Sequence, residues 1–192
     1  KSKFFLIFII SIFFSNFTNA EQFIFETEEI NITDKSNIIY AKNGKAFTND
    51  KKVLIQAKNF EYFKNLKLLK AFNGEAELTI EKLRIKFDKL TLNEKNQIIE
   101  ANENVKIIDL EKNFTISSDS LFYNQKKGIL KSDTKSILKD KYGNEFISQN
   151  FHYNLDENKI KIKNAFLNDT SGNKFFIDLA YINTLTNKLF GK

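Results

Sequence analysis

Apolar and polar residues alternate with a period of two along most of the chain beyond residue 20. For example, Leu83, Ile85 and Phe87 alternate with Arg84 and Lys86. This alternation predicts strands that bury one face, and the β-branched and aromatic residues that fill these runs favour the same structure. No stretch beyond the first twenty residues carries a sustained helical stripe. The pattern therefore predicts an all-β chain.

The alternation is part of a longer pattern that reads apolar, any, small or polar, any, any, apolar, any, apolar. The third copy breaks the rule with Phe87, and the sixth, which consists of Phe176, Asp178, Tyr181 and Asn183, is weaker. Recurrence about every 30 residues indicates structural units that stack on one another. The six copies begin at Phe25, Ile55, Ile85, Ile116, Phe146 and Phe176.

A second apolar pattern follows about fifteen residues after the start of each of the first four copies. It reads Ile39-Tyr-Ala41, Leu69-Lys-Ala71, Ile99-Glu-Ala101 and, in a degenerate form, Leu130-Lys-Ser132. Polar turn sequences such as Asn93-Glu-Lys-Asn96 separate the two patterns. Each unit is thus strand, turn, strand, turn. We predict a repetitive antiparallel β-jellyroll with two facing sheets.

The apolar phase slips by one residue inside each copy, for example between Ala57 and Phe60. A slip of one residue reverses the face that points inward, and a β-bulge or a sharp corner restores it. The same slip in every unit predicts strands that all turn a corner at one level. The strands at both ends of such a stack lack a partner, and these edges suit joining to another protein by strand addition.

The first twenty residues have the pattern of a secretory signal peptide. Lys1 and Lys3 precede an apolar run over 4–14, and Thr18-Asn19-Ala20 supplies small residues for cleavage. The run is too short for a spanning helix of about 20 residues. We expect residues 1–20 to be the signal peptide and residues 21–192 to be one exported β domain, truncated at its C-terminus. An uncleaved membrane anchor is the alternative.

Composition bears mainly on what the chain does not do. The net charge is +6, and charges of both signs are mixed along the chain, so we expect a solvated lysine-rich surface and no nucleic-acid partner. The single histidine, His152, and the lack of cysteine exclude a typical zinc or iron site. No carboxylate recurs at a fixed position of the pattern. We expect no catalytic residues, no metal and no cofactor, hence no enzyme.

The repeated Ile-x-Ala-x-x-Phe-x-Tyr, followed by Leu-x-Ala-x-x-Gly-x-Ala, resembles the OstA-type β-jellyroll of the lipopolysaccharide transport proteins. The likeness is clearest in Val53–Thr79 and covers about 23–183. It implies an open, V-shaped jellyroll in the periplasm whose interior carries the acyl chains of lipid A. The segments 25–31 and 187–192 look more like the N-terminal periplasmic domain of the outer-membrane lipopolysaccharide-assembly protein (organic solvent tolerance protein) than like the free periplasmic bridge protein of the family.

The resemblance also implies partners and candidate residues. The partners would be lipopolysaccharide, other jellyroll transport proteins joined by edge-strand addition, and an outer-membrane barrel if the chain belongs to the assembly protein. Plain core packing is the alternative role of each candidate, and a structural exported β-solenoid or a carbohydrate-active β-helix enzyme remain the alternative functions. The candidate lipid-binding residues are Ile55, Phe60, Tyr62, Leu69, Ile85, Phe87, Leu90, Leu92, Ile99, Ile116, Leu121 and Tyr123.

Overall fold

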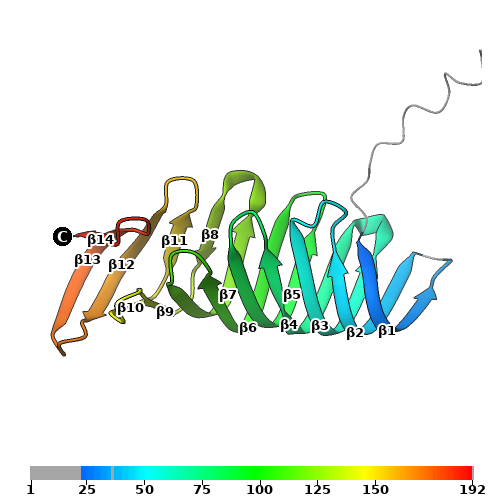
Figure 1. Cartoon of the computed structure of the whole chain (residues 1–192), viewed down its shortest axis with the longest axis horizontal. Coiled ribbons are helices and arrows are strands. Elements are labelled where there is room, and N and C mark those ends of the chain that lie inside the picture. The colour runs from blue at the N-terminus through cyan, green and yellow to red at the C-terminus, as the bar shows by residue number, and fades with distance from the viewer. Residues whose placement is uncertain (1–22, 36, 192) are drawn as a thin grey trace, which may run out of the picture.

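The computed structural model describes residues 23–35 and 37–191. The expected signal peptide lies outside these residues. Within them, fourteen strands form one antiparallel sheet that is folded on itself (Figure 1). The strands are β1 (Ile24–Thr33), β2 (Ile38–Phe47), β3 (Val53–Phe63), β4 (Leu68–Leu78), β5 (Leu83–Asn93), β6 (Ile98–Asp109), β7 (Thr115–Asn124), β8 (Ile129–Ser132), β9 (Ser136–Lys139), β10 (Glu145–Ser148), β11 (Phe151–Asn154), β12 (Lys159–Asn168), β13 (Lys174–Asn183) and β14 (Lys188–Gly191).

Each strand from β1 to β7 pairs with its neighbours in the sequence. Beyond β7 the two layers separate into different strands: β8 and β11 continue one layer, and β9 and β10 continue the other. Both layers rejoin on β12, which pairs with β10 and β11. The result is the all-β, antiparallel jellyroll that the alternation predicted.

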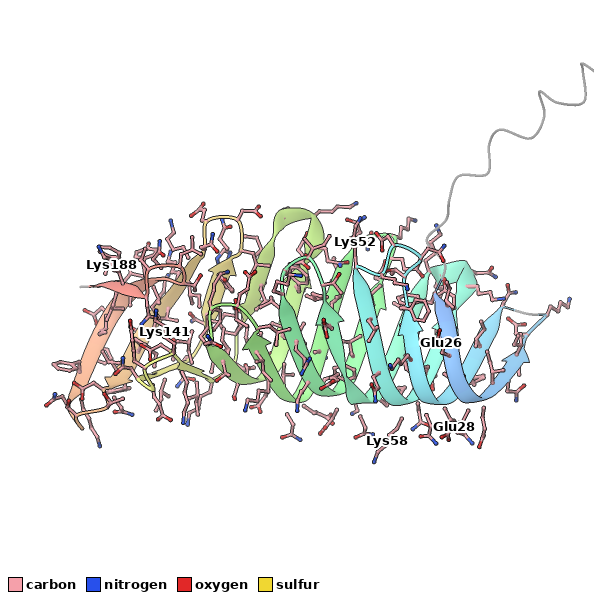
Figure 2. The ribbon with its side chains drawn as sticks, in the orientation of Figure 1. Glu26, Glu28, Lys52, Lys58, Lys141 and Lys188 are labelled. Carbon is pink, nitrogen blue, oxygen red and sulfur yellow. The ribbon has the colours of Figure 1, made fainter. Side chains whose placement is uncertain are left out.

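A corner runs along the stack where the apolar phase slips. Lys58 and Asn59 are consecutive exposed residues of β3, and the pairs on either side, Ala57 with Gly74 and Asn59 with Phe72, leave Asn73 between them. Asn73 has a φ of 53°, which asparagine tolerates better than most residues. Figure 2 places Lys58 at this lower margin of the stack. The predicted corner is therefore present.

Gly74 lies at the corner because the strands approach too closely there for a side chain. A Cβ atom on Gly74 would collide with the backbone oxygen of Gln56 and with Ala57 on β3. Gly44 has the same relation to Glu26 and Thr27 one unit earlier. The paired glycines are thus a steric requirement of the corner.

The third and fourth copies of the pattern begin 31 residues apart, at Ile85 and Ile116, whereas the other copies begin 30 residues apart. This additional residue has a local cause. Glu103 and Asn104 of β6 both have positive φ, and the pairing with β7 passes from Asn102 with Ser120 to Val105 with Ser118. Two residues of β6 therefore stand opposite Asp119 alone, which is the arrangement of a β-bulge. The bulge absorbs the additional residue without moving any inward side chain to the outer face.

Hydrogen-bonded hydroxyl groups lie where the layers separate. Ser118 on β7 contacts Ser132 at the end of β8 (Oγ to Oγ, 2.9 Å) and accepts from Ser136 at the start of β9 (3.0 Å). These three serines are buried. Their mutual bonds satisfy polar groups at the point where the chain leaves one layer for the other.

The prediction for the sixth copy of the pattern is wrong by one residue in the sequence. Ala180 and Ile182 of β13 are buried, and they stand opposite Ile162 and Ile160 of β12. Phe176, expected to face inward, is 56% exposed. The cause is that β13 carries apolar residues on both faces, so the apolar pattern alone did not identify the inward one.

The two ends of the stack are edge strands. Within residues 23–35 and 37–191, β1 pairs only with β2, and its Ile30 and Ile32 are half exposed although they stand opposite the buried Ala41 and Ile39. At the other end, β14 covers only Ala180–Asn183 of β13. Both ends therefore present unpaired backbone groups, as expected for a stack of such units.

Candidate functional site

All twelve candidate residues lie in one continuous apolar core between the two layers. Each is at most 3% exposed, and the core extends from Phe23 before β1 to Ile182 in β13. Side chains of the two layers contact each other within it; the ring of Phe25 meets that of Phe60 edge-on at 5.9 Å between centroids. The structure thus brings the candidates together, and in this state their neighbours are one another.

The turns between strands form two rims along the stack, opposite the corner. Rim A contains the turns over 48–52, 79–82, 110–114, 140–144 and 169–173. Rim B contains residues 34, 35 and 37 and the turns over 64–67, 94–97, 125–128, 155–158 and 184–187. Backbone hydrogen bonds join successive turns of the same rim, for example Thr79 to Lys52 in rim A and Glu94 to Lys67 in rim B. We call the opening between the two rims the mouth.

Among the described residues, polar side chains cross the mouth at several levels. The Tyr123 hydroxyl, at the rim B end of β7, donates to Glu81 of rim A at 2.5 Å. Lys112 of rim A donates to the Tyr153 hydroxyl of β11 at 3.0 Å. Nearer the C-terminus, Asn187 of rim B donates to Asp140 of rim A at 3.2 Å. The corner joins the two layers at one margin of the stack. These contacts hold the layers together at the opposite margin.

Two tyrosines of the core carry their hydroxyl groups to carboxylates at the mouth. Tyr62 donates to Glu94 at 2.7 Å, as Tyr123 donates to Glu81. Burial, together with the neighbouring carboxylate, raises the pKa of both hydroxyls well above the ordinary value of 10. Both tyrosines therefore stay protonated and act as donors throughout the range in which proteins are stable.

Lys112 is held by several groups at once. It lies 3.6 Å from the buried carboxylate of Asp109 and donates to Tyr153. Burial favours loss of its proton, but Tyr153 and Asp109 outweigh that effect and raise the pKa of the ammonium group. Lys112 thus remains a cation that bridges its own turn and the opposite rim.

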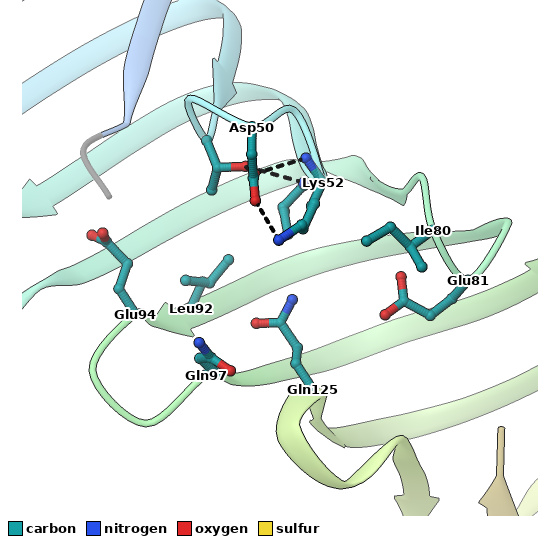
Figure 3. A pocket seen from close by; sticks show the side chains of 10 residues that line it. Asp50, Lys52, Ile80, Glu81, Leu92, Glu94, Gln97 and Gln125 are labelled. Carbon is teal, nitrogen blue, oxygen red and sulfur yellow. Dashed lines mark hydrogen bonds and ion pairs between the residues drawn. The ribbon is translucent and has the colours of Figure 1, made fainter. Parts of the chain in front are cut away.

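A cleft of about 200 Å³ opens at the mouth between the levels of Tyr62 and Tyr123. Its floor contains Val53 and Leu92, which are both buried core residues, and Ile80 stands at its margin with 63% of its surface exposed. Figure 3 shows Asp50 and Lys52 on one side of the cleft and Glu94 and Gln97 on the other. Rim A and rim B therefore both contribute to its walls.

Asp50 is fixed on the rim A side of the cleft. It accepts from the Thr48 hydroxyl at 2.7 Å and forms an ion pair of 2.7 Å with Lys52. Burial pushes its pKa upward, but the bonds from Lys52 and Thr48 outweigh burial and lower the pKa to about 2. Asp50 is therefore an anion at neutral pH, and the stabilisation that this gives is present above about pH 4 and lost as the pH falls toward 2.

The contact between Tyr123 and Glu81 can be measured by a double-mutant cycle. We expect Tyr123→Phe to lower the free energy of unfolding by about 1.5 to 3 kcal/mol, the range for a bond to a charged partner. Glu81→Gln should cost less, and the double variant should show a coupling energy of about 1 kcal/mol between the two positions. Urea unfolding followed by circular dichroism measures all four proteins. Additive losses would mean that the hydroxyl and the carboxylate do not stabilise the closed mouth together.

The alternation did not identify the rim residues that cross the mouth. Glu81, Lys112 and Asp140 lie in turns, where the period of two no longer applies. One signal was present: the last position of the pattern is tyrosine at Tyr62, Tyr123 and Tyr153 but leucine at Leu92. A tyrosine that recurs at the end of a buried strand indicates a hydroxyl that reaches a polar margin.

Two further properties concern the described part of the chain, 23–35 and 37–191. No helix there is both long and apolar enough to cross a membrane. No group of three or more histidine, aspartate or glutamate side chains there is arranged to hold a metal ion.

Comparison with known proteins gives a structural likeness alone. No protein-family model matches the chain, and no curated protein matches it. Among solved structures, the chain is similar to LptH, described as the LptA homologous periplasmic component of the conserved lipopolysaccharide transport device from Pseudomonas aeruginosa. The identity is 9%, the match covers 70% of this chain and 77% of LptH, and the TM-score is 0.28. A likeness at this distance assigns no residue a role.

Proposed function

We propose that the chain is a periplasmic lipopolysaccharide-binding domain that passes its ligand toward the outer membrane through the apolar interior of the jellyroll. The observation that carries the proposal is the continuous core, which runs through the whole stack and reaches the surface at a cleft in the mouth. The pattern over Val53–Thr79, which resembles the family of such transport domains, agrees with this role.

The energetics of the ligand favour an enclosed route. Each methylene group kept from water contributes roughly 0.8 kcal/mol, so a glycolipid with several acyl chains is strongly disfavoured in free solution. A long interior lined by Ile55, Ile85 and Ile116 at equivalent positions offers similar surroundings at each level. The ligand would then move between levels of similar energy rather than bind tightly at one of them.

Binding requires the layers to move apart, because the candidate residues fill the interior in the present state. Contacts between layers would be exchanged for contacts with acyl chains, which are equally apolar. The polar contacts across the mouth, such as Tyr123 with Glu81, would open at the levels that the ligand occupies. We propose that the closed core is the ligand-free form of a sheet that opens at its mouth.

Within this proposal, the chain acts as the N-terminal domain of the outer-membrane assembly protein, joined by its edge strands to other jellyroll domains. A free periplasmic bridge of the same fold is the second possibility. A structural role is the third, and one specific observation favours it: the twelve candidate side chains are as completely buried as those of an ordinary core.

Photocrosslinking in cells tests the proposal. A photoreactive residue at Tyr62, Leu90 or Tyr123 should form adducts with lipopolysaccharide. The exposed residues Lys58 and Lys89, on the same strands as Tyr62 and Leu90, are matched controls and should form none. If no interior position gives an adduct in folded, exported protein, the structural role replaces the proposed one.

A further inference from the structure

The mouth is built differently at the level of Leu92 than at the levels on either side. Tyr62, Leu92, Tyr123 and Tyr153 occupy the same place in four successive units. The three tyrosines place a hydroxyl at the mouth, bonded to Glu94, Glu81 and Lys112 respectively. The bonds of Tyr123 and Tyr153 run between the rims, whereas that of Tyr62 lies within rim B. Leucine is shorter and has no hydroxyl group, so it cannot make such a bond. The cleft of about 200 Å³ lies above this leucine.

Apolar surface continues from solvent to the core at this level. Ile80 is a large aliphatic side chain that is 63% exposed at the margin of the cleft. Val53 and Leu92 form the floor, and both belong to the buried core. An apolar ligand that approaches the mouth here meets Ile80 first and Leu92 next, without first crossing a hydroxyl bonded between the rims.

We propose that the cleft at Leu92 is the port through which an acyl chain of the ligand enters the interior. This inference rests on the proposed function and specifies where loading begins. The volume is below the roughly 300 to 1,000 Å³ of pockets that enclose a whole small molecule, so the cleft accepts the end of one chain rather than an entire glycolipid. The layers then separate on either side as the chain advances.

The charges of the cleft indicate which part of the ligand stays outside. Asp50, Glu81 and Glu94 supply three carboxylates and Lys52 one ammonium group, which gives a formal charge of −2 (1 − 3). Such a rim disfavours phosphate groups and suits sugar hydroxyls, which can donate to carboxylates. We infer that the saccharide part of the ligand rests on the rim while the chain enters below it.

Two variants test the port. Leu92→Tyr introduces the tyrosine that three other units have at this position. It should slow loading about tenfold, because one additional hydrogen bond must then open before the acyl chain enters. Ile80→Gln removes the exposed apolar margin and should slow loading about threefold, since less apolar surface guides the chain. Leu66→Gln is the matched control, because Leu66 is an exposed aliphatic residue of rim B (62%) outside the cleft; it should load like the wild type.

The measurement is stopped-flow fluorescence of the purified protein mixed with lipopolysaccharide that carries a fluorescent acyl chain, with the melting temperature of each variant recorded alongside. Wild-type loading with unchanged rates in Leu92→Tyr and Ile80→Gln would refute the port and leave the proposed function standing. A wild-type protein that takes up no ligand would overturn the proposed function and the port together. If Leu92→Tyr fails to fold, the comparison of Ile80→Gln with Leu66→Gln decides the question, because both residues are exposed.

Discussion

Gly74→Val should abolish or severely weaken folding, with a loss of about 3 kcal/mol or more in the free energy of unfolding. Even a single Cβ atom at this position would collide with the backbone oxygen of Gln56 and with Ala57. Backbone atoms of a paired strand cannot rotate away as a side chain can, so the strands would have to separate at the corner. Separation would break ladder hydrogen bonds between β3 and β4.

Gln56→Val is the matched control for this prediction. Gln56 stands on the neighbouring strand with its side chain exposed on the outer face, so the same new side chain meets solvent there rather than backbone. We expect its effect to stay within about 0.5 kcal/mol. Urea unfolding followed by circular dichroism compares the two variants. Equal stability of Gly74→Val and Gln56→Val would show that the strands at the corner leave room for a side chain at position 74.

Phe60→Ala should cost about 3 to 5 kcal/mol, the range for a buried phenylalanine truncated in a core. Phe60 is 1% exposed, and its ring packs against Phe25 of the opposite layer. The loss combines the transfer of the ring with the cavity that remains between the layers. Phe63→Ala, three residues further along β3 on a partly exposed side chain, is the control and should cost about 1 kcal/mol or less.

Ligand changes this second prediction in a way that bears on function. If acyl chains occupy the interior, lipopolysaccharide should recover part of the stability lost in Phe60→Ala, because an acyl chain that fills the cavity left by the ring binds the folded state of this variant more favourably than that of the wild type. The ligand should have little effect on the loss in Phe63→Ala. Unfolding curves with and without lipopolysaccharide measure the difference. Equal losses in Phe60→Ala with and without ligand would indicate that the space near Phe60 is never occupied.

Local patterns in the sequence were sufficient for the fold because each strand buries one face. The alternation around Ile85 located β5, and the slip between Ala57 and Phe60 located the corner, since both depend on which side of a strand a residue occupies. The same reasoning failed in β13, where Phe176 and Tyr181 make the outer face apolar as well. There the inward face is decided by the pairing with β12, which no local pattern records.

The candidate site was predictable only in part. The sequence identified the buried positions as a set, and the structure places them in one core, yet whether lipid reaches them depends on motion between the layers. The contacts across the mouth join residues about 40 positions apart, such as Glu81 with Tyr123 and Lys112 with Tyr153. Which residues meet across the mouth depends on how far rim A and rim B of one unit are displaced from each other along the stack. That displacement is a property of the folded protein.

The corner can act as a hinge that runs along the stack. Hydrogen bonds between strands run along the stack, so the layers can turn about the line that passes Asn73 while those bonds stay intact. An acyl chain that separates the two layers at one unit must then also separate them at the neighbouring units, because each layer is stiff along the stack. This hinge is interrupted between Ser132 and Ser136, where the two layers are formed by the separate strands β8 and β9 instead of by one bent strand. We therefore expect the layers to open together from β1 to β7 and the opening to weaken beyond β7.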